Sequence, residues 1–179
     1  AAEGAAITFK IPRRIDIPAD NTPHETTVLV LELPAALDYL TVPKLIDEVY
    51  RRASVTNDSA VTMLPAPVRL FLGGEFVGRA QLSKVAPQET FETTMGMDDR
   101  IKVERELALQ EASKQLIGDR RVLRFGYEIE VQNLLPQRAE IVVRDQVPVA
   151  VHEDIRVRME KVDPPPAEQS EQGELTWKL

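Results

Sequence analysis

Apolar and polar side chains alternate with a period of two along most of this chain, and this alternation limits the folds that it can adopt. From Leu123 to Val131 every second residue is apolar, and the residues between them are charged or glycine. Successive side chains of a β-strand point to opposite faces, so the pattern predicts a strand with one buried and one solvated face. The same reasoning predicts strands at 26–33, 38–45, 49–56, 68–72, 75–79, 89–95, 139–144, 155–160 and 175–179.

Turn signals separate the predicted strands. Gly73-Gly74 lies between two apolar runs, where the positive φ angles of a tight hairpin turn favour glycine. Many of the 13 prolines also lie between runs, where a missing N–H group does least harm to a sheet. The stretch 107–118 leaves two alternatives open. Its helix formers and terminal glycine allow a short helix, whereas the period of two that enters it favours a long strand running into a loop.

Short strands with regular turn signals predict an all-β fold, an antiparallel β-sandwich of immunoglobulin-like type. A weak echo between 53–59 and 129–134 suggests two sandwich subdomains that divide near Asp98-Asp99. We therefore expect an N-terminal sandwich part at 1–98, which lacks upstream strands, and a C-terminal immunoglobulin-like sandwich at 99–179. One continuous sandwich is the alternative. The proline-rich stretch 163–173 is expected to be a solvated loop.

The composition excludes several classes of chemistry. The chain of 179 residues has no cysteine and two histidines, which excludes disulfides, thiolate metal sites, cysteine nucleophiles and three-histidine zinc sites. Its 29 acidic and 22 basic residues give a net charge of −7, which disfavours nucleic acids and anionic membrane surfaces as partners. Apolar runs such as 28–31 are far shorter than the roughly 20 residues of a membrane-spanning helix. The compartment stays open.

Few residues could form a chemical site. Asp98-Asp99 with Glu104 could offer oxygens to a calcium ion, but the spacing of a calcium loop is missing, and a solvated or turn-capping role fits better. His24 and His152 are expected to be surface residues. We predict no catalytic, cofactor-binding or metal-binding residue, no cofactor and no enzymatic activity.

Two further groups of residues have a structural explanation. Arg51-Arg52 and Arg120-Arg121 lie at predicted strands, where successive side chains diverge, so we expect solvated faces rather than an anion site. Trp177 and Phe125 are expected in the core, because large aromatic side chains dominate burial in sandwiches. An exposed Trp177 would instead mark a contact surface.

Eight short motifs follow one another along nearly the whole chain. They are Val42-Pro43-Lys44, Val55-Thr56-Asn57, Leu64-Pro65-Ala66-Pro67-Val68, Phe71-Leu72-Gly73-Gly74-Glu75-Phe76-Val77-Gly78, Val85-Ala86-Pro87, Gly96-Met97-Asp98, Ile101-Lys102-Val103-Glu104-Arg105 and Asp145-Gln146-Val147-Pro148. In this order they resemble the C-terminal uncharacterised domain of the mucoidy-inhibitor-like (MuiA) family. Ala66, Gly73 and Gln88 depart from its usual turn residues.

The resemblance implies a larger protein with a β-rich N-terminal domain, a coiled-coil middle segment and this β-rich C-terminal domain. It implies no activity, cofactor or catalytic residue, and the family name implies a link to the mucoid, exopolysaccharide-producing phenotype. The chain begins at Ala1 rather than at a methionine, so we expect it to be a fragment with further sequence upstream.

Together these features predict a non-catalytic β-sandwich module that mediates protein–protein or intrachain contacts. Its expected partner is its own upstream coiled-coil segment or a second copy of the chain. The alternative is a module that binds a carbohydrate or an envelope polymer. A row of exposed aromatic side chains on one sheet face would favour this alternative, whereas burial of Phe125, Tyr127 and Trp177 would favour protein contacts.

Overall fold

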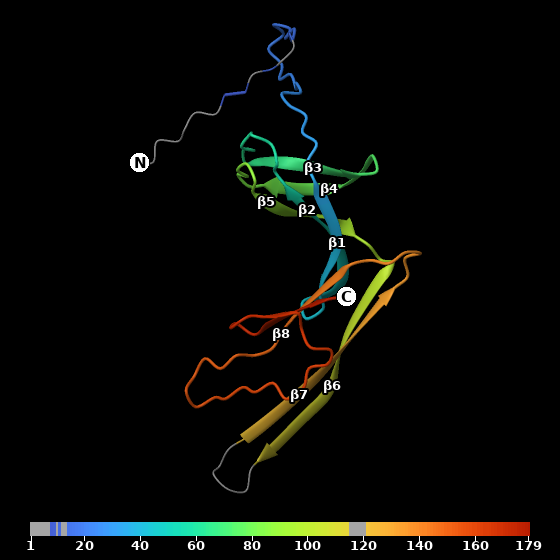
Figure 1. The fold of residues 1–179 in the computed structure, drawn as a ribbon, viewed down its shortest axis with the longest axis vertical. Helices are drawn as coiled ribbons and strands as arrows, with labels where there is room; N and C mark the ends of the chain where they lie inside the picture. Colours follow the sequence, from blue (N-terminus) through green and yellow to red (C-terminus); the bar gives the residue numbers. More distant parts are fainter. Residues whose placement is uncertain (1–7, 10, 12–13, 115–120) are drawn as a thin grey trace.

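The described part of the chain is built from β-strands (Figure 1). The computed structural model describes residues 8–9, 11, 14–114 and 121–179, and these ranges contain ten strands and no helix. The prediction of an all-β fold is confirmed. The strands are β1 (Ala35–Val42), β2 (Ile46–Thr56), β3 (Ala66–Leu72), β4 (Glu75–Leu82), β5 (Thr90–Met97), β6 (Ile101–Lys114), β7 (Arg121–Asn133), β8 (Ile141–Gln146), β9 (Glu168–Gln169) and β10 (Glu174–Lys178).

Six strands form one sheet in the order β5-β2-β1-β8-β10-β9, and the pairs β3–β4 and β6–β7 form two-stranded sheets. Neighbours in the large sheet are antiparallel except β1 and β8, which are parallel with Tyr39 opposite Ile141. Strands from both sides of Asp98-Asp99 share this sheet through the β1–β8 pair. The division at 98/99 and the immunoglobulin-like arrangement stay predictions.

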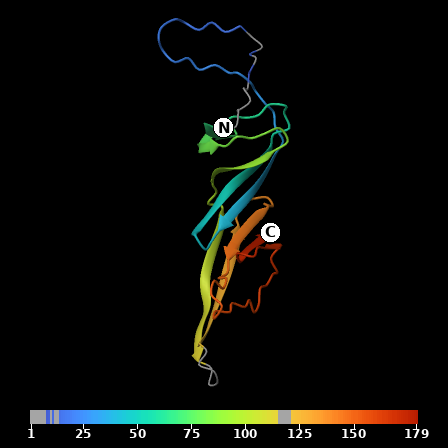
Figure 2. The same cartoon turned by 90° about the vertical axis from the view of Figure 1, so that its left-hand side faces the viewer.

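The main core lies between the base of the β6–β7 hairpin and the large sheet (Figure 2). Val49 from β2, Ile101 and Val103 from β6, and Ile141 and Val143 from β8 form a buried cluster. Ile129, Val131 and Trp177 are among the partly buried side chains that pack against it. Two apolar sheet faces thus bury each other, which is the packing of a β-sandwich.

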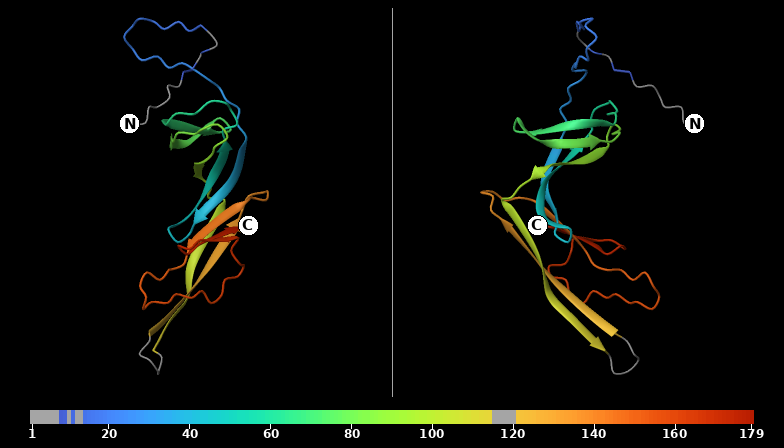
Figure 3. Two further views of the ribbon diagram at one scale, coloured as in Figure 1. Left: turned by 60° about the vertical axis from the view of Figure 1, so that its left-hand side comes forward. Right: turned by 180° about the vertical axis from the view of Figure 1, so that it is seen from behind.

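The molecule is elongated, with its two hairpins toward opposite ends. Figures 1 and 3 show β3–β4 in the upper half and the far part of β6–β7 extending away from the large sheet at the lower end. Beyond the core, no strand of the described chain faces the β6–β7 hairpin in these views. This extension positions the surface described below.

Two predicted strands are wrong. Residues 26–33 contain the apolar run 28–31 and residues 155–160 alternate, but neither range belongs to a strand. An extended segment becomes a strand only when a neighbouring strand accepts and donates its backbone hydrogen bonds, and no β-ladder includes either segment. Of the two alternatives for 107–118, the long strand is confirmed up to Lys114, and the remaining residues lie outside the described part of the chain. The stretch 163–173 is mostly loop but contains the short strand β9.

Candidate functional site

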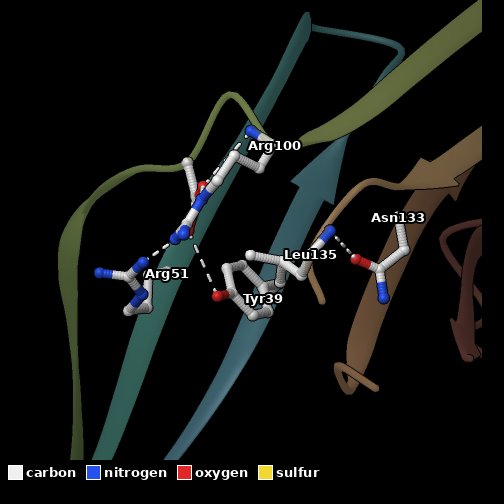
Figure 4. A network of polar contacts seen from close by, with 6 residues as sticks. Tyr39, Arg51, Arg100, Asn133 and Leu135 are labelled. Carbon is white, nitrogen blue, oxygen red and sulfur yellow. Dashed lines mark hydrogen bonds and ion pairs between the residues drawn. The ribbon is translucent and has the colours of Figure 1, made fainter. Parts of the chain in front are cut away.

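Asp98 lies in the turn between β5 and β6, and its side chain is buried with an exposed fraction of 3%. Its carboxylate accepts hydrogen bonds from Nε and Nη2 of Arg100 at 2.8 and 2.7 Å. Arg51 from β2 donates through Nη2 at 2.5 Å, and the Tyr39 hydroxyl donates at 3.3 Å. Figure 4 shows Arg51, Arg100 and Tyr39 converging on this carboxylate.

This environment favours the ionised form of Asp98. The hydrogen bond from the Arg100 side chain, with those from the Arg100 backbone and Arg51, holds the pKa of Asp98 well below its usual range. Burial acts in the opposite direction but is outweighed. The result is a carboxylate that stays ionised at neutral pH and joins β1, β2 and the β5–β6 turn.

The geometry supports the turn-capping role of Asp98 rather than metal binding. The Arg100 backbone N–H donates to Oδ1 of Asp98 at 3.3 Å, and Asp98 thereby closes the turn. Two guanidinium groups already occupy its oxygens and would repel a cation. Among the described residues, no group of three or more His, Cys, Asp or Glu side chains is placed to hold a metal ion.

A pocket of about 570 Å³ lies beside this turn, between β2 and the base of the β6–β7 hairpin. Its lining residues include the acidic residues Asp47, Glu48, Asp98, Asp99, Glu104 and Glu130, and also Lys102. The pocket is therefore acidic and attracts cations in general. The buried hydroxyl of Thr93, which has no hydrogen-bond partner, does not line it. Nothing else in the lining selects one ligand.

Arg105 anchors the β6–β7 hairpin to the large sheet. Its guanidinium carbon lies 3.6 Å from the centroid of the Tyr127 ring, and its Nε donates to Oδ2 of Asp145 at 3.0 Å. The Arg105 and Asp145 side chains are 14% and 9% exposed, so this cation–π contact and ion pair are largely shielded from water. Sequence reasoning missed this anchor, although an arginine on the apolar face of an alternating strand is a usable signal.

Beyond Arg105, the apolar face of the hairpin is half exposed. Strand register places Leu107 opposite Tyr127, Gln110 opposite Phe125 and Ala112 opposite Leu123. Successive pairs on the other face are Glu104 with Glu130 and Glu106 with Glu128. Near its base the hairpin therefore has an acidic face and an apolar face, and farther out the face opposite the apolar one carries Leu109 with Gly126 and Glu111 with Arg124. On the apolar face, the exposed fractions are 50% for Leu107, 64% for Leu123, 50% for Phe125 and 49% for Tyr127.

The two predicted core aromatics differ in outcome. Trp177 packs against the main core, and its indole Nε1 donates to the carbonyl of Pro164 at 2.9 Å. The prediction for Phe125 is wrong, because β7 continues past the layer that would cover it. The alternation identified the correct face of the strand but not the length over which that face is buried.

The histidines and glycines lie where the sequence predicts. His24 and His152 are at the surface, and each has an aspartate beside it: Nε2 of His24 is 2.8 Å from Asp20, and Nδ1 of His152 is 3.5 Å from Asp154. The hydrogen bond with His24 lowers the pKa of Asp20. Gly73 and Gly74 form the β3–β4 turn with φ angles of +58° and +88°.

Arg51 and Arg52 point in different directions, as expected for neighbours on a strand. The expectation of a solvated face is wrong, since Arg51 pairs with Asp98, and Arg52 pairs with Asp38 and Glu92. Their side chains are 18% and 11% exposed. Arg121 is the exposed first residue of β7, and Arg120 lies outside the described residues.

Asn57 is a structural residue whose burial sequence reasoning missed. It is fully buried, and its Nδ2 donates to the carbonyls of Val61, Val85 and Ala86 at 2.9–3.3 Å. Its Oδ1 accepts from the Ser59 hydroxyl. The sequence signal is the Asn-led turn after β2, which marks the position but not the burial. At the corresponding turn after β7, Oδ1 of Asn133 accepts from the Leu135 N–H at 2.9 Å (Figure 4).

Comparison with known proteins places the chain in a family. A family model described as a domain of unknown function, DUF4139, matches residues 1–179. The chain belongs to the DUF4139 family. One curated relative of this DUF4139 chain is Protein F37C4.5 of Caenorhabditis elegans, 23% identical over 158 residues. The match covers 86% of this chain and 28% of that protein, so the DUF4139 chain spans less than a third of the relative's length.

No solved structure matches the DUF4139 chain. Within the described ranges, it also has no helix that is long and apolar enough to cross a membrane. Among the described residues, the buried side chains of Asp98 and Asn57 have structural partners, and the apolar face of β6–β7 is half exposed.

Proposed function

We propose that this DUF4139 domain is a non-catalytic module that contacts another polypeptide segment through the β6–β7 hairpin. The observation that carries the proposal is the half-exposed apolar face beyond Arg105, formed by Leu107, Leu123, Phe125 and Tyr127. We call these four side chains the hairpin face.

Exposure of the hairpin face is costly for a structure of this kind. A two-stranded hairpin is only marginally stable in water by itself, and the outer part of β6–β7 pairs with no further strand in the described chain. Covering four half-exposed large side chains would contribute about 1 kcal/mol each. A contacting segment thus stabilises the hairpin and gains affinity from the same surface.

The partner that fits is an apolar stripe of a protein. An amphipathic helix supplies such a stripe, and the same hairpin face of a second copy supplies an equivalent one. In both arrangements the acidic side chains of Glu104, Glu106, Glu128 and Glu130 stay in water on the opposite face. We therefore propose an upstream coiled-coil segment or a second copy as the partner, with no role for nucleic acid or membrane insertion.

The family resemblance supports the same proposal. We propose that the chain belongs to a mucoidy-inhibitor-like (MuiA) branch of the DUF4139 family, because the eight motifs occur in order along it. In that architecture a coiled coil precedes this domain and would offer the amphipathic helix.

One observation favours the alternative of a carbohydrate or envelope-polymer module. Phe125 and Tyr127 are half exposed on one sheet face, as a sugar-stacking surface requires. We place this function second, because Arg105 covers one face of the Tyr127 ring and the neighbouring side chains are leucines. Heat of binding to soluble polysaccharides in titration calorimetry, lost in Phe125→Ser, would reverse this order.

Site-specific photo-crosslinking of the purified full-length protein tests the proposal. A benzophenone side chain replaces Leu123 on the hairpin face, and a matched control replaces Glu128 on the acidic face. We expect crosslinks to a defined polypeptide segment from position 123 and few from position 128. Equal yields at the two positions, or none at 123, would contradict the proposal.

A further inference from the structure

The outer face of the β3–β4 hairpin combines two arginines with two phenylalanines. Register places Arg69 directly opposite Arg79 and Phe71 directly opposite Phe76. The phenylalanine rings meet edge to face with centroids 5.7 Å apart, and their exposed fractions are 53% and 55%. The inner face is formed by partly buried side chains including Val68, and β5 packs against the hairpin.

The arginine pair attracts an anion. Like charges directly opposite each other on a sheet are destabilising, and a carboxylate placed between two guanidinium groups removes the repulsion. Arg69 lies 3.8 Å from the carboxylate of Glu25, which is 96% exposed and so held loosely. Arg79 forms no ion pair within the described residues.

We propose that the outer face of β3–β4 binds an extended acidic peptide segment of a partner protein. Carboxylates of the peptide pair with Arg69 and Arg79, and an apolar side chain of the peptide packs against Phe71 and Phe76. This surface is separate from the hairpin face of β6–β7, so the two proposals succeed or fail independently.

Three observations favour an extended peptide. The β3–β4 sheet has two strands only, so in the described chain each strand has an edge without a ladder partner, and backbone groups of a peptide can pair there. Glu25 shows that a carboxylate from an extended segment reaches Arg69. Arg69 and Phe71 are two residues apart on β3, and an extended peptide presents alternate side chains on one face at the same spacing.

The test measures binding of a labelled peptide to the full-length protein by fluorescence anisotropy. The peptide has the sequence of residues 23–33, which contains Glu25, Glu32 and the apolar run 28–31. We expect saturable binding that weakens with added salt. A peptide with both glutamates changed to lysine should bind roughly tenfold more weakly, the effect of about 1.4 kcal/mol.

Protein variants locate the site. Arg69→Glu with Arg79→Glu should reduce affinity by at least roughly tenfold, and Phe71→Ser with Phe76→Ser should also reduce it. The matched control is Arg156→Glu with Arg158→Glu, which makes the same charge change on an exposed loop and should leave affinity unchanged.

Three results would overturn the proposal. The first is no saturable binding of the peptide, and the second is equal loss of affinity in the arginine variant and its control. The third is binding to phosphatidylserine vesicles with no binding of the peptide, which would indicate a membrane surface instead.

Discussion

Replacement of Asp98 by alanine removes the carboxylate that joins β1, β2 and the β5–β6 turn. Arg51, 18% exposed, then keeps a charge with no counter-ion at that position, whereas Arg100 is 54% exposed and recovers much of its hydration. Breaking a buried ion pair from one side costs about 3–5 kcal/mol, and the exposure of Arg100 places this case at the lower end. We expect Asp98→Ala to lower the free energy of unfolding by about 3 kcal/mol.

Thermal and urea unfolding followed by circular dichroism measure this loss. At this chain length, about 3 kcal/mol corresponds to a fall in Tm of roughly 6–12 °C. Asp99→Ala is the matched control, because Asp99 is the exposed neighbour, and it should change stability by less than about 0.5 kcal/mol. If Asp98→Ala costs less than about 1 kcal/mol, or no more than Asp99→Ala, the structural role assigned to Asp98 is wrong.

Three further results are expected. The folded-state pKa of Asp98 is lowered from 3.8, so the ionised Asp98 side chain stabilises the fold above pH 3.8, and this stabilisation is lost as the pH falls toward the folded-state pKa. In urea titrations, the difference in unfolding free energy between wild type and Asp98→Ala should therefore shrink in acid. Asn57→Ala removes the side-chain donor to the carbonyls of Val61, Val85 and Ala86. The carbonyls of Val85 and Ala86 keep backbone donors from Met63 and Glu89, so we expect a loss of about 2 kcal/mol in urea unfolding. A loss as small as that of a surface substitution would contradict the structural role of Asn57. Gly173→Ala places a Cβ 2.4 Å from the Val147 carbonyl oxygen at φ +80°, whereas the Cβ of Gly73→Ala at φ +58° meets nothing within 4 Å. Thermal melts should therefore show a much larger fall in Tm for Gly173→Ala, and equal falls in Tm would refute the steric argument.

Strands that have both an alternating pattern and a neighbouring strand were predictable from the sequence. Strands β2, β5 and β7 lie close to the predicted ranges, because the pattern reports a half-buried face directly. Residues 155–160 alternate as regularly and form no ladder. Pairing depends on which segment lies alongside, and a period of two contains no information about that neighbour.

The polar sites were predictable in position only. The Asp98-Asp99 turn and the Asn57 turn are visible in the sequence, but the partners of Asp98 are set by the tertiary fold. The Asp98 N–H donates to the carbonyl of Val49 at 2.9 Å, and this contact brings the turn beside Arg51. A separation of 47 residues between Arg51 and Asp98 leaves no local signal.

The hairpin face shows the limit of burial predictions from alternation. Ile129 and Phe125 occupy the same face of β7, yet Ile129 packs against the core and Phe125 is 50% exposed. The difference arises because the large sheet ends before the hairpin does, and the length of an opposing layer is a property of the whole fold.

Hydroxyl-radical footprinting of the purified full-length protein tests the central claim most directly. Phe125 on the hairpin face and Phe71 on β3 are the same residue type with nearly equal exposed fractions, 50% and 53%, so their intrinsic oxidation rates are matched. If another segment of the protein or a second copy covers the hairpin face, Phe125 will be oxidised several-fold more slowly than Phe71. Equal oxidation rates for the two phenylalanines would show that the hairpin face is open to water and would contradict the proposed contact.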